Sequence, residues 1–220
     1  MELKYPCLVL DHDDTVVEST PTIHYPTFME ALKTLRPEIH WSLQEYMDYN
    51  FDPGFEPLCR DILKFTPAEE AYQEQLWRES AAYMKPPMFP GMSELLTRFH
   101  NANGTICVIS HSSEMVIAED YQRLCGFKPD LIYGWERGEG HRKPEAWPLL
   151  QILNKTNLKP TDLLMVDDMK PGWIMAKNCQ VPFAFAGWGN PSQKAHSFMK
   201  EHTEYVFDYV KQLSNLVFSK

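Results

Sequence analysis

The stretch Leu8-Val9-Leu10-Asp11-His12-Asp13-Asp14-Thr15 decides how the rest of the chain is interpreted. Residues 7–10 form an apolar run typical of a buried parallel strand, and the run ends at three carboxylates within four positions. Crowded carboxylates raise one another's pKa unless a cation neutralises them. Ligands of open α/β sheets bind at the carboxyl ends of strands. A solvated acidic turn is the plain alternative, whereas a calcium loop does not fit, because Val16 stands where that loop needs glycine.

Composition narrows the class of protein. The 220 residues, 44% hydrophobic and 23% charged, suit a soluble globular protein of one domain plus a smaller insertion. A net charge of -9 argues against a nucleic-acid surface. The sequence has no apolar signal-peptide core and no apolar run long enough to span a bilayer. The five cysteines are an odd number without paired spacing, so we expect a reducing, cytoplasmic compartment and neither a nucleic acid nor a membrane as partner.

The order of elements predicts the fold class. Residues 20–88 are helix-like, with capping boxes at Ser42–Glu45 and Thr66–Glu69. Beyond them, strands are expected at 105–109, 131–133, 163–166 and 181–186, and helices at 93–101, 114–125, 145–154, 172–178 and 202–217. Alternating strands and helices favour a parallel sheet. We therefore predict an α/β fold, a Rossmann-like parallel sheet sandwiched by helices, with residues 1–16 and 89–220 as the core and residues 17–88 as an inserted all-helical cap.

Polar residues follow three of the expected strands. They are Asp11 and Asp13 after the first, Ser110 after the second, and Asp167 and Asp168 after the fourth. Strand ends of a parallel sheet share one edge, so these side chains should converge. Each has a plainer interpretation, since Ser110 could help to cap the next helix and the acidic pair could be a turn. The basic cluster His141-Arg142-Lys143-Pro144 could be a surface loop or the cation of the site.

This set of residues suits phosphoryl transfer. Carboxylates from two strand ends can hold Mg²⁺, which prefers oxygen ligands. The metal and Lys143 would offset charge on phosphate oxygens, while Ser110 and the amides of the following helix would donate hydrogen bonds. One carboxylate can attack phosphorus to form an aspartyl phosphate, and a second, two residues on, can protonate the leaving oxygen.

On these residues the chain resembles the haloacid dehalogenase superfamily, whose pattern is D-x-D-x-T, a Ser or Thr at a strand end, a Lys, and an acidic pair. The matching segments, in the same order, are Asp11-His12-Asp13-Asp14-Thr15, Ser110, Lys143-Pro144 and Asp167-Asp168-Met169-Lys170-Pro171-Gly172. The resemblance implies Asp11 as nucleophile, Asp13 as acid/base, and Mg²⁺ held by Asp11, the Asp13 carbonyl, and Asp167 or Asp168. Ser110 and Lys143 complete the expected catalytic set, and the expected substrate-binding residues are Thr15, Ser110, His111 and Lys143. Residues 16–88 resemble the small helical cap of one subclass.

The expected activity is Mg²⁺-dependent hydrolysis of a small-molecule phosphate monoester by a monomer or weak dimer. A sugar phosphomutase uses the same core residues and stays open, as does a non-catalytic, phosphate-binding regulatory protein. Dehalogenation is disfavoured because it needs neither the second Asp nor the acidic pair. Pro171 and Gly172 stand where many relatives carry another Asp, which resembles the phosphoglucomutase-like branch and leaves open how Asp167 and Asp168 share the metal.

Overall fold

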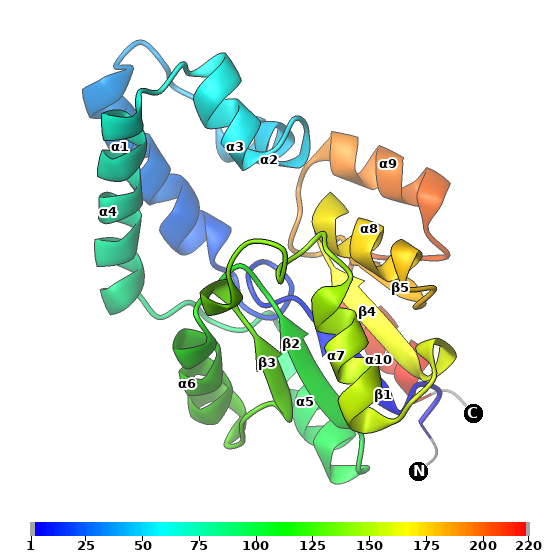
Figure 1. The fold of residues 1–220 in the computed structure, drawn as a ribbon. Coiled ribbons are helices and arrows are strands. Elements are labelled where there is room, and N and C mark those ends of the chain that lie inside the picture. The colour runs from blue at the N-terminus through cyan, green and yellow to red at the C-terminus, as the bar shows by residue number, and fades with distance from the viewer. Residues whose placement is uncertain (1–2, 219–220) are drawn as a thin grey trace.

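The computed structural model describes residues 3–218 and contains one parallel six-stranded sheet in the order β3-β2-β1-β4-β5-β6 (Figure 1). The strands are β1 Cys7–Leu10, β2 Thr105–Ile109, β3 Leu131–Tyr133, β4 Leu163–Asp167, β5 Phe183–Ala186 and β6 Tyr205–Phe207. The predicted α/β, Rossmann-like parallel sheet is therefore confirmed.

The central position of β1 explains its uninterrupted apolar sequence. It pairs with β2 on one side and β4 on the other, so that Leu8 lies opposite both Ile106 and Leu164. All four β1 residues are fully buried because both faces of the sheet are covered. Leu8 and Leu10 enter the core on one face, and Cys7 and Val9 enter the core on the other.

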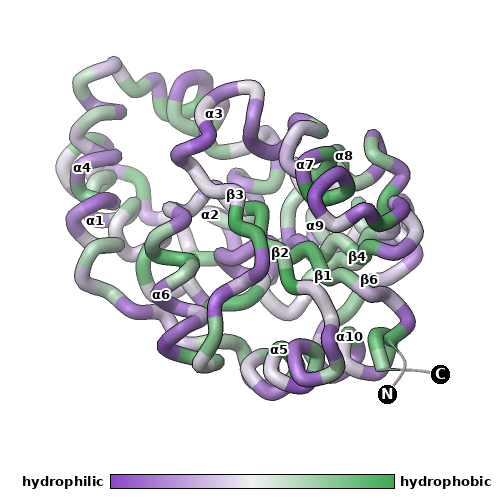
Figure 2. The backbone as a smooth tube through the Cα atoms, turned by 60° about the horizontal axis from the view of Figure 1, so that its bottom comes forward, coloured by the Kyte–Doolittle hydropathy of each residue, from purple (hydrophilic) through white to green (hydrophobic). Residues whose placement is uncertain are grey.

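Helices cover both faces of the sheet. The face of Leu8 packs against α5 Met92–Asn101, α6 Glu114–Cys125 and α10 Val210–Val217. The opposite face packs against α7 Trp147–Thr156, α8 Lys170–Asn178 and α9 Gln193–His202. Figure 2 shows the central strands in the green of hydrophobic residues, and more of the purple of hydrophilic residues along the surrounding helices. None of the helices within residues 3–218 is long and apolar enough to cross a membrane.

Between β1 and α5 the chain forms a separate group of helices, here called the helical segment (Thr20–Tyr83). It comprises a π-helical turn Thr20–His24, α1 Tyr25–Leu35, α2 Leu43–Phe51, the short α3 Phe55–Pro57, a second π-helical turn Leu58–Ile62, and α4 Pro67–Tyr83. Both predicted capping boxes are present, at the starts of α2 and α4. The segment has its own apolar cluster around Phe28, Leu32 and Leu58. Figure 1 shows α1 and α4 side by side, away from the sheet.

Two short linkers join the helical segment to the rest of the chain. In the outgoing linker (Val16–Glu18), Val17 bridges to Met88 of the return linker (Lys85–Met88) in antiparallel fashion. The Glu18 amide also donates to the Pro87 carbonyl at 2.9 Å. The division into a core of 1–16 and 89–220 and a cap of 17–88 stays a prediction, and residues 1–2 and 219–220 of that core lie outside the described range.

The expected single helix over 202–217 is wrong. Residues 193–202 form α9, Tyr205–Phe207 form β6, and α10 begins only at Val210. The run Tyr205-Val206-Phe207 is too short to show a period, and it lies at the edge of the sheet, where all three side chains are only half-buried. The strand expected at 181–186 begins later, at Phe183, and the helix expected at 145–154 begins at Trp147, with Pro148 in its first turn.

Candidate active site

Three acidic side chains meet at the carboxyl edge of the sheet. Asp11 directly follows β1, Asp167 ends the neighbouring strand β4, and Asp168 comes next. One carboxylate oxygen of each lies within 4.8 Å of the others, and all three residues are buried. The predicted convergence of the first and fourth strand ends is therefore confirmed.

The ammonium group of Lys143 lies between two of these carboxylates. Its Nζ is 2.9 Å from Asp11 Oδ1 and 2.7 Å from Asp167 Oδ2, and the residue is 7% exposed. Burial alone would lower the pKa of Lys143, but Asp11 and Asp167 raise it, so the lysine is a fixed positive charge. Of the two interpretations of the basic cluster, the surface loop does not fit Lys143, which is buried between two acidic side chains.

One ammonium does not balance this much buried negative charge. Burial raises the pKa of Asp167 to about 7, and burial together with Asp14, Asp167 and Asp11 raises the pKa of Asp168 well above its ordinary value. Asp14 is also buried, and its pKa is raised to about 7. Buried carboxylates without enough positive charge, and oxygen as the only donor atom, fit a hard divalent cation such as Mg²⁺.

The two members of the acidic pair differ in their protein partners. Asp167 Oδ1 accepts the Met169 amide at 2.8 Å, and its Oδ2 accepts Lys143. Asp168 has one side-chain contact among the described residues, a long one of 3.5 Å between its Oδ2 and Asn190 Nδ2. Asp168 therefore has the freer oxygens of the two.

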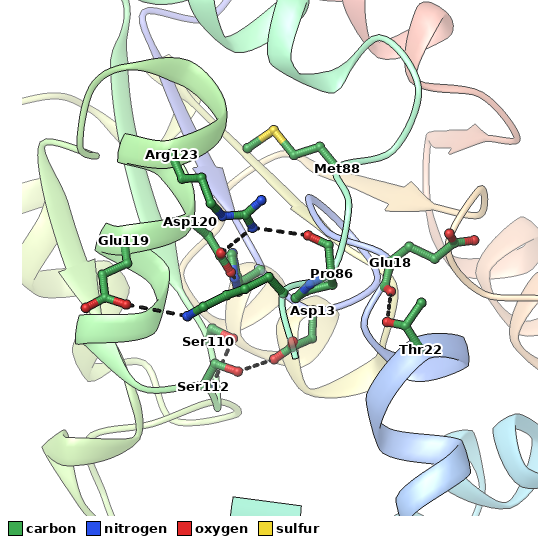
Figure 3. Close-up of polar contacts among 12 residues, drawn as sticks. Asp13, Glu18, Thr22, Pro86, Met88, Ser110, Ser112, Glu119, Asp120 and Arg123 are labelled. Atoms are coloured by element: carbon green, nitrogen blue, oxygen red, sulfur yellow. Dashed lines mark hydrogen bonds and ion pairs between the residues drawn. The ribbon is translucent and has the colours of Figure 1, made fainter. Parts of the chain in front are cut away.

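The side chain of Asp13 contacts one residue of the helical segment and one residue that follows β2. Its Oδ2 accepts a short hydrogen bond from Ser112 Oγ, and its Oδ1 lies 3.4 Å from His24 Nε2 (Figure 3 shows the serine contact). Burial would raise the pKa of Asp13, but His24 and Ser112 lower it far below its usual range. The pKa of His24 is raised because its pairing with Asp13 outweighs burial. Trp77 of α4 donates its indole N–H to His24 Nδ1 at 2.8 Å.

The remaining expected residues take varied positions. Ser110 is buried, and its Oγ accepts the Ser112 amide at 3.2 Å. This bond lies before the N-cap of α6, Ser113, so Ser110 does not cap that helix. His111 Nε2 lies 3.1 Å from the Lys143 carbonyl and so braces the lysine loop. Thr15 is fully buried, its hydroxyl has no hydrogen-bond partner within residues 3–218, and its carbonyl accepts the Trp188 indole at 3.0 Å.

Sequence reasoning missed His24, Ser112 and Asn190. The Asn190 side chain donates to the Asp168 backbone carbonyl at 2.9 Å and so steadies the acidic loop. Asn190 follows β5 at the same sheet edge, and this position could have identified it as a candidate site residue. Nothing in the sequence around His24 sets it apart, because its role comes from how the helical segment packs.

Comparisons with known proteins bear on the family and the fold of the chain. The haloacid dehalogenase-like hydrolase family model matches residues 8–186. A structure titled as a haloacid dehalogenase-like hydrolase from Bacteroides fragilis is 19% identical, with a TM-score of 0.79, over 96% of this chain and 100% of that one. CbbY from Rhodobacter sphaeroides, in complex with phosphate, is 16% identical with a TM-score of 0.69, over 95% of this chain and 96% of that one.

A third solved structure is titled as a predicted phosphoglycolate phosphatase from Haemophilus somnus. It is 15% identical with a TM-score of 0.75, over 96% of each chain. No curated protein matches the chain significantly. These identities support the shared fold, and the family match spans most of the chain, from β1 to the end of β5. The chain belongs to the haloacid dehalogenase-like hydrolase family.

Proposed function

We propose that this hydrolase is a Mg²⁺-dependent phosphatase that cleaves a small-molecule phosphate monoester through an aspartyl phosphate on Asp11. The observation that carries the proposal is the buried Lys143 ammonium, in contact with both Asp11 and Asp167 while Asp168 lies beside them. A phosphate placed there would meet a nucleophile, a fixed positive charge and a set of carboxylates that suits a divalent cation. Little else is needed for phosphoryl transfer.

The first half-reaction uses Asp11 and Asp13. A carboxylate oxygen of Asp11 attacks phosphorus, and the bond from phosphorus to the alcohol oxygen breaks. Asp13 delivers a proton to that leaving oxygen. Because the pKa of Asp13 lies far below its usual range in the substrate-free protein, Asp13 takes this proton up from solvent when the phosphate binds, with His24 Nε2 at 3.4 Å from its Oδ1. In the second half-reaction, Asp13 takes a proton from water, which attacks phosphorus and releases inorganic phosphate and the Asp11 carboxylate.

The metal would be held by Asp11, the Asp13 carbonyl and Asp168. When bound, Mg²⁺ neutralises charge on the phosphate oxygens and on the carboxylates around them. Asp168 is the better candidate for the principal ligand of the acidic pair, because both oxygens of Asp167 already accept hydrogen bonds from the protein. Lys143 holds Asp11 in place and would bind the transferring phosphoryl group.

The helical segment would act as a cap over this site. His24 and Trp77 are its contribution beside Asp13. Lys170, two residues after Asp168, contacts Asp52 at 3.0 Å and lies over the Phe51 ring, so the end of α2 rests close to the acidic pair. Two sides of the site would then be closed to water by one group of helices. The substrate fits the class of small phosphorylated metabolites, and a cytoplasmic location would suit it.

Replacing the nucleophile tests the proposal. Asp11→Asn should abolish turnover of an aryl phosphate in Mg²⁺ while leaving the far-ultraviolet circular dichroism unchanged, because an amide does not attack phosphorus. Asp61→Asn, at an exposed position in the helical segment, is the control and should keep wild-type turnover. Residual activity of the folded Asp11→Asn protein above a few percent would contradict the assignment.

A further inference from the structure

His12 lies in the sequence between Asp11 and Asp13, the two proposed catalytic carboxylates, and its side chain contacts the core. His12 is 1% exposed, and its Nε2 lies 3.3 Å from Oδ2 of Asp120 on α6. A buried imidazole is costly unless it has a polar partner. The Asp120 contact therefore fixes the His12 ring, and with it the backbone that carries Asp11 and Asp13.

Asp120 is held in turn by an arginine that reaches the return linker. Arg123 Nη2 donates to Asp120 Oδ1 at 2.6 Å, and the same nitrogen donates to the Pro86 carbonyl at 3.2 Å. Figure 3 shows Arg123 between Asp120 and Pro86, with both contacts dashed. One guanidinium thus joins the carboxylate that fixes His12 to the segment through which the chain leaves the helical segment.

The outgoing linker also forms hydrogen bonds with His12. The amides of Val16 and Val17 donate to the His12 carbonyl at 2.9 and 3.1 Å. The Phe89 amide, just after the return linker, donates to the Val16 carbonyl at 3.1 Å. The contacts form a closed ring, from the His12 ring through α6 to the return linker, across to the outgoing linker, and back to the His12 carbonyl.

We propose that Asp120 and Arg123 are positioning residues, which couple the linkers of the helical segment to the backbone between nucleophile and acid/base. The inference rests on the proposed function and adds to it a part for α6, which the sequence motifs do not touch. A shift of the return linker at Pro86 would displace Arg123, and through Asp120 it would displace His12. Because a misplacement of about 1 Å can cost about 100-fold in rate, a small movement at Pro86 is enough to change turnover.

The coupling predicts a specific pattern in a double-mutant cycle. Arg123→Met and Asp120→Asn should each lower kcat for an aryl phosphate about tenfold, with KM within about twofold, and the double variant should be no slower than either single one. Arg137→Met is the matched control, since Arg137 also pairs with an acidic residue of α6, Glu114, and is equally exposed at 40%. It lies outside the ring and should leave kcat unchanged.

The readouts separate this inference from a purely structural role and from the proposed function. Thermal unfolding identifies variants that are merely unstable, and Arg123→Met serves as the second variant if the buried Asp120→Asn does not fold. Folded variants with wild-type kcat, or single effects that multiply in the double variant, would overturn the coupling. If the wild-type protein itself hydrolyses no phosphate monoester, the proposed function fails, whatever the variants do.

Discussion

At the scale of single residues, Gly172 sets how closely α8 approaches the site. A Cβ added at Gly172 would lie 2.2 Å from Asp167 Oδ2 and 2.4 Å from Asp167 Cγ. Glycine inside a helix costs up to about 1 kcal/mol relative to alanine. The missing side chain leaves room for Asp167 Oδ2 to stay 2.7 Å from Lys143. The glycine at this position thus has a packing reason.

Gly172→Ala should therefore lower both activity and the free energy of unfolding, because the new methyl group displaces the Asp167 carboxylate. In an Asp167→Ala background the clash is gone, and Gly172→Ala should then be neutral or stabilise by up to about 1 kcal/mol through helix propensity. Chemical denaturation of the four proteins measures both effects. An equal effect of Gly172→Ala in the two backgrounds would show that the Asp167 contact does not matter.

At the scale of elements, the junction of the first π-helical turn with α1 brings the helical segment to Asp13, the proposed acid/base. His24 ends that turn, and Trp77 from α4 holds its ring from behind. His24→Gln should reduce kcat/KM about 10- to 100-fold for an alkyl phosphate and much less for an aryl phosphate, whose leaving group needs little protonation. Trp77→Phe, which removes only the indole donor, should act in the same direction but more weakly. Equal losses with the two substrates would argue against a role for His24 at Asp13.

The elements also show what the sequence can and cannot predict. The strand β1 was predictable because both of its faces are buried, which leaves a continuous apolar run, and the capping boxes were predictable because their contacts are local. Strand β6 was not predictable, because a three-residue edge strand is too short to show an alternation of apolar and polar residues. Motif order predicted that Asp11 and Asp167 would meet. His24 comes to Asp13 only through the packing of α1 against α4, which no local pattern encodes.

At the scale of the whole molecule, the site concentrates negative charge inside an already acidic protein. The chain has a net charge of -9, and Asp11, Asp14, Asp167 and Asp168 are all buried near one another, with Lys143 as the buried ammonium among them. Each raised carboxyl pKa means that the ionised form is unfavourable in the folded state. The metal-free protein should therefore be strained electrostatically at this edge of the sheet.

Mg²⁺ should relieve that strain and raise the melting temperature. A ligand that binds only the folded state stabilises it by RT ln(1 + [Mg²⁺]/Kd), which is about 2.7 kcal/mol at 100 times Kd. EDTA should reverse the shift and stop hydrolysis together. Millimolar Mg²⁺ that changes neither melting nor turnover would contradict the metal site.

The two members of the acidic pair should then respond to different extents to removal of their charge. Asp168→Asn removes a carboxylate whose main neighbours are other carboxylates, so the metal-free protein should melt at a higher temperature while the Mg²⁺-dependent rise is lost. Asp167→Asn also removes a carboxylate with a raised pKa, but it leaves the buried Lys143 with one acidic partner fewer, so the melting temperature of the metal-free protein should rise less than with Asp168→Asn. Differential scanning fluorimetry of both variants, with EDTA and with Mg²⁺, measures the four shifts. If Asp168→Asn keeps the full Mg²⁺ response and Asp167→Asn loses it, Asp167 is the principal ligand, and the assignment based on free oxygens is wrong.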